Sequence, residues 1–296
     1  MTQPSLPVTD EPAVIASLDV GARGQDVSPR VAWAALAWTL VRTDFKVRYH
    51  STFSGFAWAL LKPAGMFLVL MLVFSFIFPD PTYKLQLIVG LFLWDFFAEG
   101  TKTGLASLHA KAFLFKKMRV PLWVLVLASI ANPLITLAVF TVVIVVFLSL
   151  AGSPPSPQGL ALFLVYCTAL TLLVVGFSLA ASVLFLRYRD LNQVWDVMAQ
   201  AGFFVAPIIY PLGIVPERLH FYFYLWPPTP IIEFSRAALV SHTVPSLIGH
   251  VYLALEVIAA VTIGVLVMRT SLQQNSWQNF SRSPCSMSGQ SYDQPG

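Results

Sequence analysis

The densest group of charged side chains lies in the stretch LVRTDFKVRYH, where Arg42, Asp44, Lys46 and Arg48 fall within seven residues. On a helix, segment 30–50 has one apolar side and one basic side, a pattern typical of a helix lying among lipid headgroups. Asp44 and Arg48 project from the apolar side four residues apart, so we expect them to pair with each other and to face protein. An ordinary juxtamembrane anchor helix is the alternative.

Three carboxylates lie inside apolar runs, where an uncompensated charge is costly. Asp95 and Glu99 are four residues apart and therefore share one helix face, which could line a proton path. Glu256 is the third. The alternative interpretation is a polar stripe turned to a pore or a neighbouring helix, with Glu99 near Lys102.

Motifs for other chemistry are missing from the sequence. No glycine is followed by lysine, so there is no GxxxxGK[ST] phosphate-binding loop, and there is no HExxH. GFSLAAS at 176–182 lacks the second glycine of a GxSxG elbow, and its small residues favour close helix packing instead. We expect no catalytic residue, metal site or cofactor in this chain.

Composition indicates what must position these residues. Of 296 residues, 57% are apolar and 11% are charged, against roughly 25% charged in soluble domains. We expect an all-α integral membrane protein with one domain, 30–272, between a flexible tail, 1–29, and a disordered tail, 273–296. The predicted spans lie near 57–78, 85–105, 121–150, 160–186, 195–213 and 251–268.

The lysines and arginines of the loops predict the orientation, because cytoplasmic loops hold the excess. Fifteen lie in 1–62, 101–120, 187–194 and 269–296, whereas Lys84, Arg218 and Arg236 lie on the other side. Both termini are therefore expected to be cytoplasmic. The net charge of +4 follows this loop pattern and does not indicate a nucleic-acid partner.

A second basic segment, SLHAKAFLFKKMRVPLW (107–123), alternates phenylalanines with cations. A short helix of this kind at the inner face of the membrane would suit docking into a groove on a partner. A positive-inside loop with snorkelling lysines is the alternative. The candidate contact residues are Phe115, Lys116, Lys117 and Arg119.

Four blocks of the sequence carry a family resemblance. They are LVRTDFKVRYHSTFSGFAWALLKPAGMFLVLMLVFSFIF, AFLFKKMRVP, LRYRDLNQVWDVMAQAGFFVAPIIYPLGIVPERL and PTPIIEFSRAAL, which together cover roughly 36–240. In this order they resemble the membrane subunit of type-2 ABC exporters of polysaccharides. That family includes O-antigen, teichoic-acid and capsular polysaccharide permeases of the bacterial cytoplasmic membrane.

The resemblance implies a homodimer joined to two copies of a separate ATPase, which would bind ATP and Mg. It implies an amphipathic interface helix at the cytoplasmic entrance and a re-entrant outer segment, 214–245, between spans five and six. It also adds Arg189 and Asp190 to the candidate ATPase contacts, and its entrance and coupling candidates are Arg42, Asp44, Lys46, Arg48 and Tyr49. The sequence departs from the family at Pro121-Leu122-Trp123 and in its last helix, which ends without a basic cluster.

Aromatic residues make up 14% of the chain, and sugar rings can lie against aromatic faces. The candidate translocation path is Trp94, Phe97, Phe204, Tyr210, Tyr222 and Trp226. Interfacial anchoring of Trp and Tyr is the alternative interpretation of such clusters. The expected function is export of a lipid-linked polysaccharide or polyol-phosphate polymer; the alternatives are export of a drug or small lipid with the same architecture and, from another class, ion-coupled transport.

Overall fold

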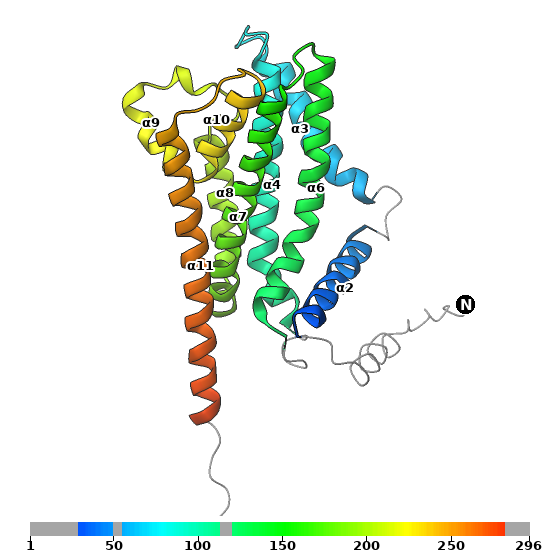
Figure 1. The fold of residues 1–296 in the computed structure, drawn as a ribbon, viewed down its shortest axis with the longest axis vertical. Helices are drawn as coiled ribbons and strands as arrows, with labels where there is room; N and C mark the ends of the chain where they lie inside the picture. Colours follow the sequence, from blue (N-terminus) through cyan, green and yellow to red (C-terminus); the bar gives the residue numbers. More distant parts are fainter. Residues whose placement is uncertain (1–28, 50–54, 113–119, 282–296) are drawn as a thin grey trace, which may run out of the picture.

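The computed structural model describes residues 29–49, 55–112 and 120–281, and the regular elements in these ranges are all helical (Figure 1). The predicted all-α class is thus confirmed for the described residues. The helices are α2 (Pro29–Tyr49), α3 (Gly55–Phe74), α4 (Tyr83–Ala110), α6 (Leu122–Leu150), α7 (Pro157–Arg187), α8 (Leu191–Val205), η2 (Leu212–Ile214), α9 (Glu217–Tyr224), α10 (Pro228–Leu239) and α11 (Leu247–Ser281).

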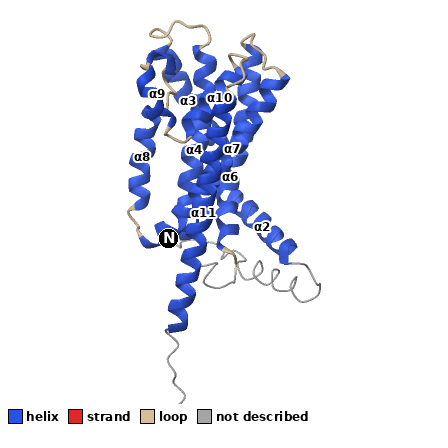
Figure 2. Cartoon of the chain, turned by 60° about the vertical axis from the view of Figure 1, so that its left-hand side comes forward, coloured by secondary structure: helices blue, strands red, loops and turns tan. Residues whose placement is uncertain are grey.

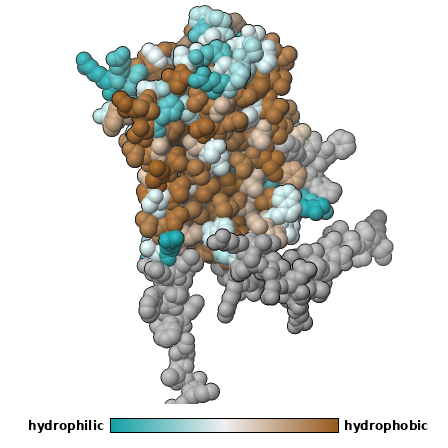
Figure 3. All heavy atoms as spheres, in the orientation of Figure 1, coloured by the Kyte–Doolittle hydropathy of each residue, from teal (hydrophilic) through white to brown (hydrophobic). Residues whose placement is uncertain are grey.

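Four of the described helices are long and apolar enough to cross a membrane: α3, α6, α7 and α11. The chain is therefore a multi-pass membrane protein, and Figure 3 shows the broad hydrophobic belt that these helices expose. The predicted second span, α4, has the necessary length but carries Lys84, Asp95, Glu99 and Lys102 along it.

The predicted fifth span, 195–213, is wrong in its bounds. α8 begins at Leu191 and ends at Val205, and its 15 residues extend about 22 Å, short of a hydrocarbon core of about 30 Å. Proline explains this end, because Pro207 has no N–H to continue the helix and restricts Ala206, which is extended. The short elements η2, α9 and α10 follow and lie at one end of the bundle (Figure 1).

α4 and α7 form the centre of the bundle, with α6, α10 and α11 packed around them. Small residues bring α7 and α11 together, as predicted for 176–182. A Cβ at Gly176 would lie 2.6 Å from the backbone carbon of Ala260, and one at Gly264 would lie 2.2 Å from the Gly176 carbonyl oxygen. Neither position has room for a side chain, so the two backbones touch.

α2 lies across the opposite end of the bundle from α9 and α10, beside α6 (Figure 1). Its predicted apolar side is confirmed for Trp33, Leu36, Ala37 and Leu40, which pack against the core. At the other terminus α11 continues to Ser281, past the expected domain end at 272. The rest of the expected tails, 1–28 and 282–296, lies outside the described residues.

Candidate functional site

Two adjoining hollows form one candidate site, which we call the trough. The smaller, about 580 Å³, lies between α2, α4, α6 and the start of α8. The larger, about 1010 Å³, lies between α3, α4 and α8. Glu99 and Lys102 line both hollows, so the trough continues from one to the other at the level of these two residues.

One face of α4 is the floor of the trough. Residues spaced three and four apart line it: Leu91, Trp94, Asp95, Ala98, Glu99, Lys102, Thr103, Ala106 and Ala110. From Leu91 to Ala110 the face extends about 28 Å at 1.5 Å per residue, close to the thickness of a hydrocarbon core. The charges that make α4 a poor lipid-facing span therefore line a hollow instead.

α8 forms the facing wall and stands at the edge of the bundle (Figure 2). Its lining residues also follow one helix face: Asn192, Asp196, Ala199, Gln200 and Phe203. The adjacent Trp195 points to the other side, where its ring lies 4.1 Å from that of Phe177 and its indole N–H donates to the Thr101 hydroxyl at 3.1 Å. Trp195 thus fixes α8 to the bundle while Asp196 faces the trough.

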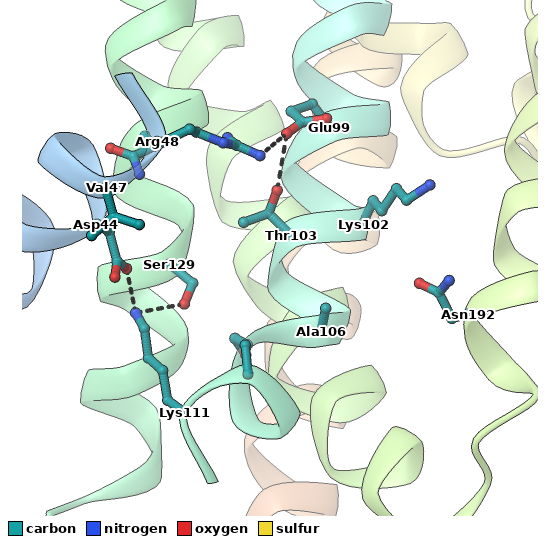
Figure 4. Close-up of a pocket in the computed structure, with 13 residues that line it drawn as sticks. Asp44, Val47, Arg48, Glu99, Lys102, Thr103, Ala106, Lys111, Ser129 and Asn192 are labelled. Carbon is teal, nitrogen blue, oxygen red and sulfur yellow. Dashed lines mark hydrogen bonds and ion pairs between the residues drawn. The ribbon is translucent and has the colours of Figure 1, made fainter. Parts of the chain in front are cut away.

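Two ion pairs join α2 to α4 at the smaller hollow (Figure 4). Arg48 donates to Glu99 at 2.6 Å, and Thr103 also donates to that carboxylate. Lys111 lies 2.5 Å from Asp44 and donates to the Ser129 hydroxyl of α6 at 2.9 Å. The Lys111 side chain is only 9% exposed, so Asp44 supplies the counter-charge for a nearly buried cation.

These contacts correct one expectation. Asp44 pairs with Lys111, directly after α4, and Arg48 pairs with Glu99 of α4, so the two do not pair with each other. Glu99 lies near Lys102 along the trough, as the alternative interpretation had it, and Lys102 crosses to Asp196 on α8, with its ammonium 2.8 Å from Oδ1. The expectation that Asp44 and Arg48 contact protein is confirmed.

The other entrance and coupling candidates are only partly placed. Arg42 and Lys46 are exposed on the side of α2 that faces away from the core, and the side chain of Tyr49 lies outside the described residues. Arg189 and Asp190 are exposed in the turn between α7 and α8. Phe115, Lys116, Lys117 and Arg119 fall in 113–119, which also lies outside the described residues.

The six aromatic path candidates separate into three groups. Trp94 and Phe204 line the larger hollow, and Phe204 is 66% exposed. Phe97 and Trp226 belong to a packed aromatic cluster, with their ring centroids 6.4 Å apart and the Trp226 ring against Gly202. Tyr210 and Tyr222 line neither hollow; Tyr210 donates to the Phe204 carbonyl, and Tyr222 is exposed.

Asp95 and Glu99 both line the larger hollow, as their shared helix face predicts. Glu256, the third carboxylate of the ion-path hypothesis, lies on α11 and lines neither hollow. The structure therefore separates it from the other two. Within the described residues there is no group of three His, Cys, Asp or Glu side chains that could hold a metal ion.

Residues 35–240, about two thirds of the chain, match the sequence model of the family described as ABC-2 type transporter. The chain belongs to the ABC-2 type transporter family. The matched range contains α4, α8 and most of α2, so the trough lies within the family domain. ABC-2 membrane domains lack a nucleotide-binding domain of their own, and the chain is accordingly a transport subunit.

Similar ABC-2 proteins include exporters with named polymers. The chain is 29% identical over 181 residues to an O-antigen export system permease protein RfbA of Klebsiella pneumoniae, covering 60% of this chain and 70% of that protein. It is 24% identical over 255 residues to RfbA of Myxococcus xanthus, covering 83% and 94%. It is 23% identical over 233 residues to the polysialic acid transport protein KpsM of Escherichia coli, covering 77% and 90%.

One residue of this ABC-2 domain was missed by reasoning from sequence. Arg236 was expected only as a charge on one side of the membrane. It is 5% exposed and binds the non-helical segment that follows α8. Its guanidinium donates to the carbonyls of Gln86, Pro207 and Ile208 and to Glu233. The signal that could have found it is Glu233, one helical turn earlier in the same short helix.

Proposed function

We propose that this ABC-2 permease exports a polysaccharide, carried on a lipid, and that a separate ATPase drives it. The support that carries this proposal is the set of polysaccharide-exporting relatives, which match along 60% to 83% of the chain. The trough gives the proposal a physical path, because its floor on α4 extends about as far as the hydrocarbon core is thick.

The proposed assembly is a homodimer with two ATPase copies, in which ATP and Mg bind to the partner. In this arrangement both termini are cytoplasmic, and α4 together with α8 and the extended segment after it completes a six-span topology. The elements η2, α9 and α10 form a re-entrant outer segment. α10 supports the last point, since most of its residues are buried although it is only 12 residues long. α2 would lie at the cytoplasmic entrance and, with 107–119, Arg189 and Asp190, would transmit the movement of the ATPase.

Trp94 and Phe204 are the path candidates that line the trough. Phe204 is the better candidate for stacking with a sugar ring, because it is 66% exposed whereas Trp94 is 6% exposed and packs against Phe97 and Phe203. Arg48 and Asp44 would act through the ion pairs that hold α2 against α4. Movement of α2 by the ATPase would open the smaller hollow, since these pairs form one of its walls.

Deleting the gene from its host tests the function. Polysaccharide should accumulate inside the cells, and the wild-type gene should restore it to the surface. Restoration should fail when the ATPase that co-purifies with the chain has lost the lysine of its phosphate-binding loop. Unchanged surface polysaccharide in the deletion strain would refute the proposal.

A further inference from the structure

The charges that line the trough are balanced. Four carboxylates and four cationic groups line it: Asp44, Asp95, Glu99, Asp196, Arg48, Lys62, Lys102 and Lys111. Three ion pairs join six of these groups across different helices. The remaining two, Lys62 and Asp95, both line the larger hollow. Among the described residues, the lining therefore has as many positive as negative groups.

A balanced lining suits some polymers better than others. A chain with a carboxylate or phosphate on every unit brings a row of negative charges, which an apolar surrounding opposes unless fixed cations outnumber fixed anions. The described residues of the trough offer no such excess. Sugar hydroxyls both donate and accept hydrogen bonds, so a neutral chain can use a carboxylate and an ammonium equally.

The two hollows of the trough meet at the level of Glu99 and Lys102. Lys102 lines both hollows and crosses to Asp196, whose Oδ1 and Oδ2 lie 2.8 and 3.0 Å from its ammonium. Among the ion pairs of the described ranges, this is the one that joins α4 to α8. In Figure 4 the Lys102 side chain points away from α2, toward the helix that carries Asn192.

This pair can part without moving the helices that carry it. Its side chains are 50% and 37% exposed, and exposed ion pairs are weak. Trp195 fixes α8 independently through Thr101 and Phe177. A rotation of the Lys102 and Asp196 side chains is therefore enough to break the pair while α4 and α8 keep their places.

We infer that the trough is selective for an electrically neutral polysaccharide, and that Lys102 and Asp196 are the specificity-determining pair where its two hollows meet. When they part, the ammonium donates to and the carboxylate accepts from the hydroxyls of the passing chain. The inference rests on the proposed function and narrows its substrate class. In the terms of the relatives, it favours a neutral O-antigen chain over a polyanion such as polysialic acid.

Binding to the full chain in lipid nanodiscs, together with its co-purified ATPase, tests the inference. The probes are a neutral mannose oligosaccharide and a sialic acid oligomer of the same length, titrated at low salt. The wild type should bind the neutral probe at least about 10-fold more tightly. Asp196→Asn leaves the Lys102 charge without its counter-charge, so it should narrow this ratio several-fold by improving binding of the anionic probe.

Two further variants test whether the change in the binding ratio comes from the charge at this pair or from a disturbed structure. The double variant Lys102→Asp with Asp196→Lys restores a neutral pair and should restore the wild-type preference. Glu217→Gln removes an exposed carboxylate on α9 outside the trough and should leave the ratio unchanged. Equal or tighter binding of the sialic acid oligomer by the wild type, no binding of either probe, or an unchanged ratio in Asp196→Asn would overturn the inference.

Complementation of the deletion strain distinguishes this failure from failure of the proposed function. A chain that restores surface polysaccharide to deletion cells but shows no preference for the neutral probe keeps its function and loses the selectivity. A chain whose deletion leaves surface polysaccharide unchanged loses both.

Discussion

The two sides of α4 differ in how they are packed. On one side Gly104 lies so close to α7 that an added Cβ would be 1.9 Å from the Ser178 hydroxyl oxygen, and Phe96 is 1% exposed. On the other side the same helix lines the trough with Glu99 and Lys102, held to α2 and α8 by half-exposed ion pairs. One helix therefore joins a close-packed half, which resists change, to a hollow half whose polar contacts can be broken and remade.

The largest loss of unfolding free energy should follow the removal of a buried polar contact in the close-packed half. Arg236→Met deletes the donor to three backbone carbonyls and to Glu233, and leaves these buried acceptors without partners. We expect a loss of about 3–5 kcal/mol of unfolding free energy, measured by thermal unfolding in detergent. Arg218→Met, on the exposed surface of α9, is the matched control. Equal stability of the two variants would contradict the role given to Arg236.

The second largest loss of stability should come from enlarging a residue at the contact between α7 and α11. Gly176→Val places a branched side chain against the backbone of Ala260, and overpacking of this kind typically costs about 1–3 kcal/mol. Gly213→Ala is the control, because no atom lies within 4 Å of the added Cβ there. Unfolding midpoints measured side by side should fall for Gly176→Val only. An unchanged unfolding midpoint for Gly176→Val would mean that α7 and α11 can move apart at little cost in free energy.

Sequence reasoning succeeded where the relevant residues lie close along one helix. The apolar side of α2 and the shared face of Asp95 and Glu99 follow from helical spacing alone. The bonding partners did not follow, because Arg48 and Glu99 are 51 residues apart and Arg236 lies 150 residues from Gln86. Local spacing instead predicted a pair between Asp44 and Arg48. Which of several possible partners a charge meets depends on how helices dock, and spacing does not encode that.

In the hollow half, removing an ion pair of α2 should destabilise α2 without affecting the rest of the bundle. Asp44→Asn removes the counter-charge of the nearly buried Lys111 and should weaken the docking of α2 by about 1 kcal/mol. Hydrogen exchange should then increase in residues 29–49 while exchange in α7 stays the same. Arg42→Gln is the control, since Arg42 is exposed on the other side of the helix. Faster exchange throughout the bundle would show that this half is not separate from the core.

The smallest effect on stability should come from removing the ion pair between Lys102 and Asp196. Lys102→Ala removes one member of an ion pair whose side chains are 50% and 37% exposed, and such pairs contribute about 0–1 kcal/mol. Trp195 still anchors α8 to Thr101, so the unfolding midpoint should hardly change. Export should nevertheless fall, because Asp196 is left as an unpaired charge where the two hollows meet. A large loss of stability would show that Lys102, like Arg236, is needed to hold the fold together, and would contradict the comparison.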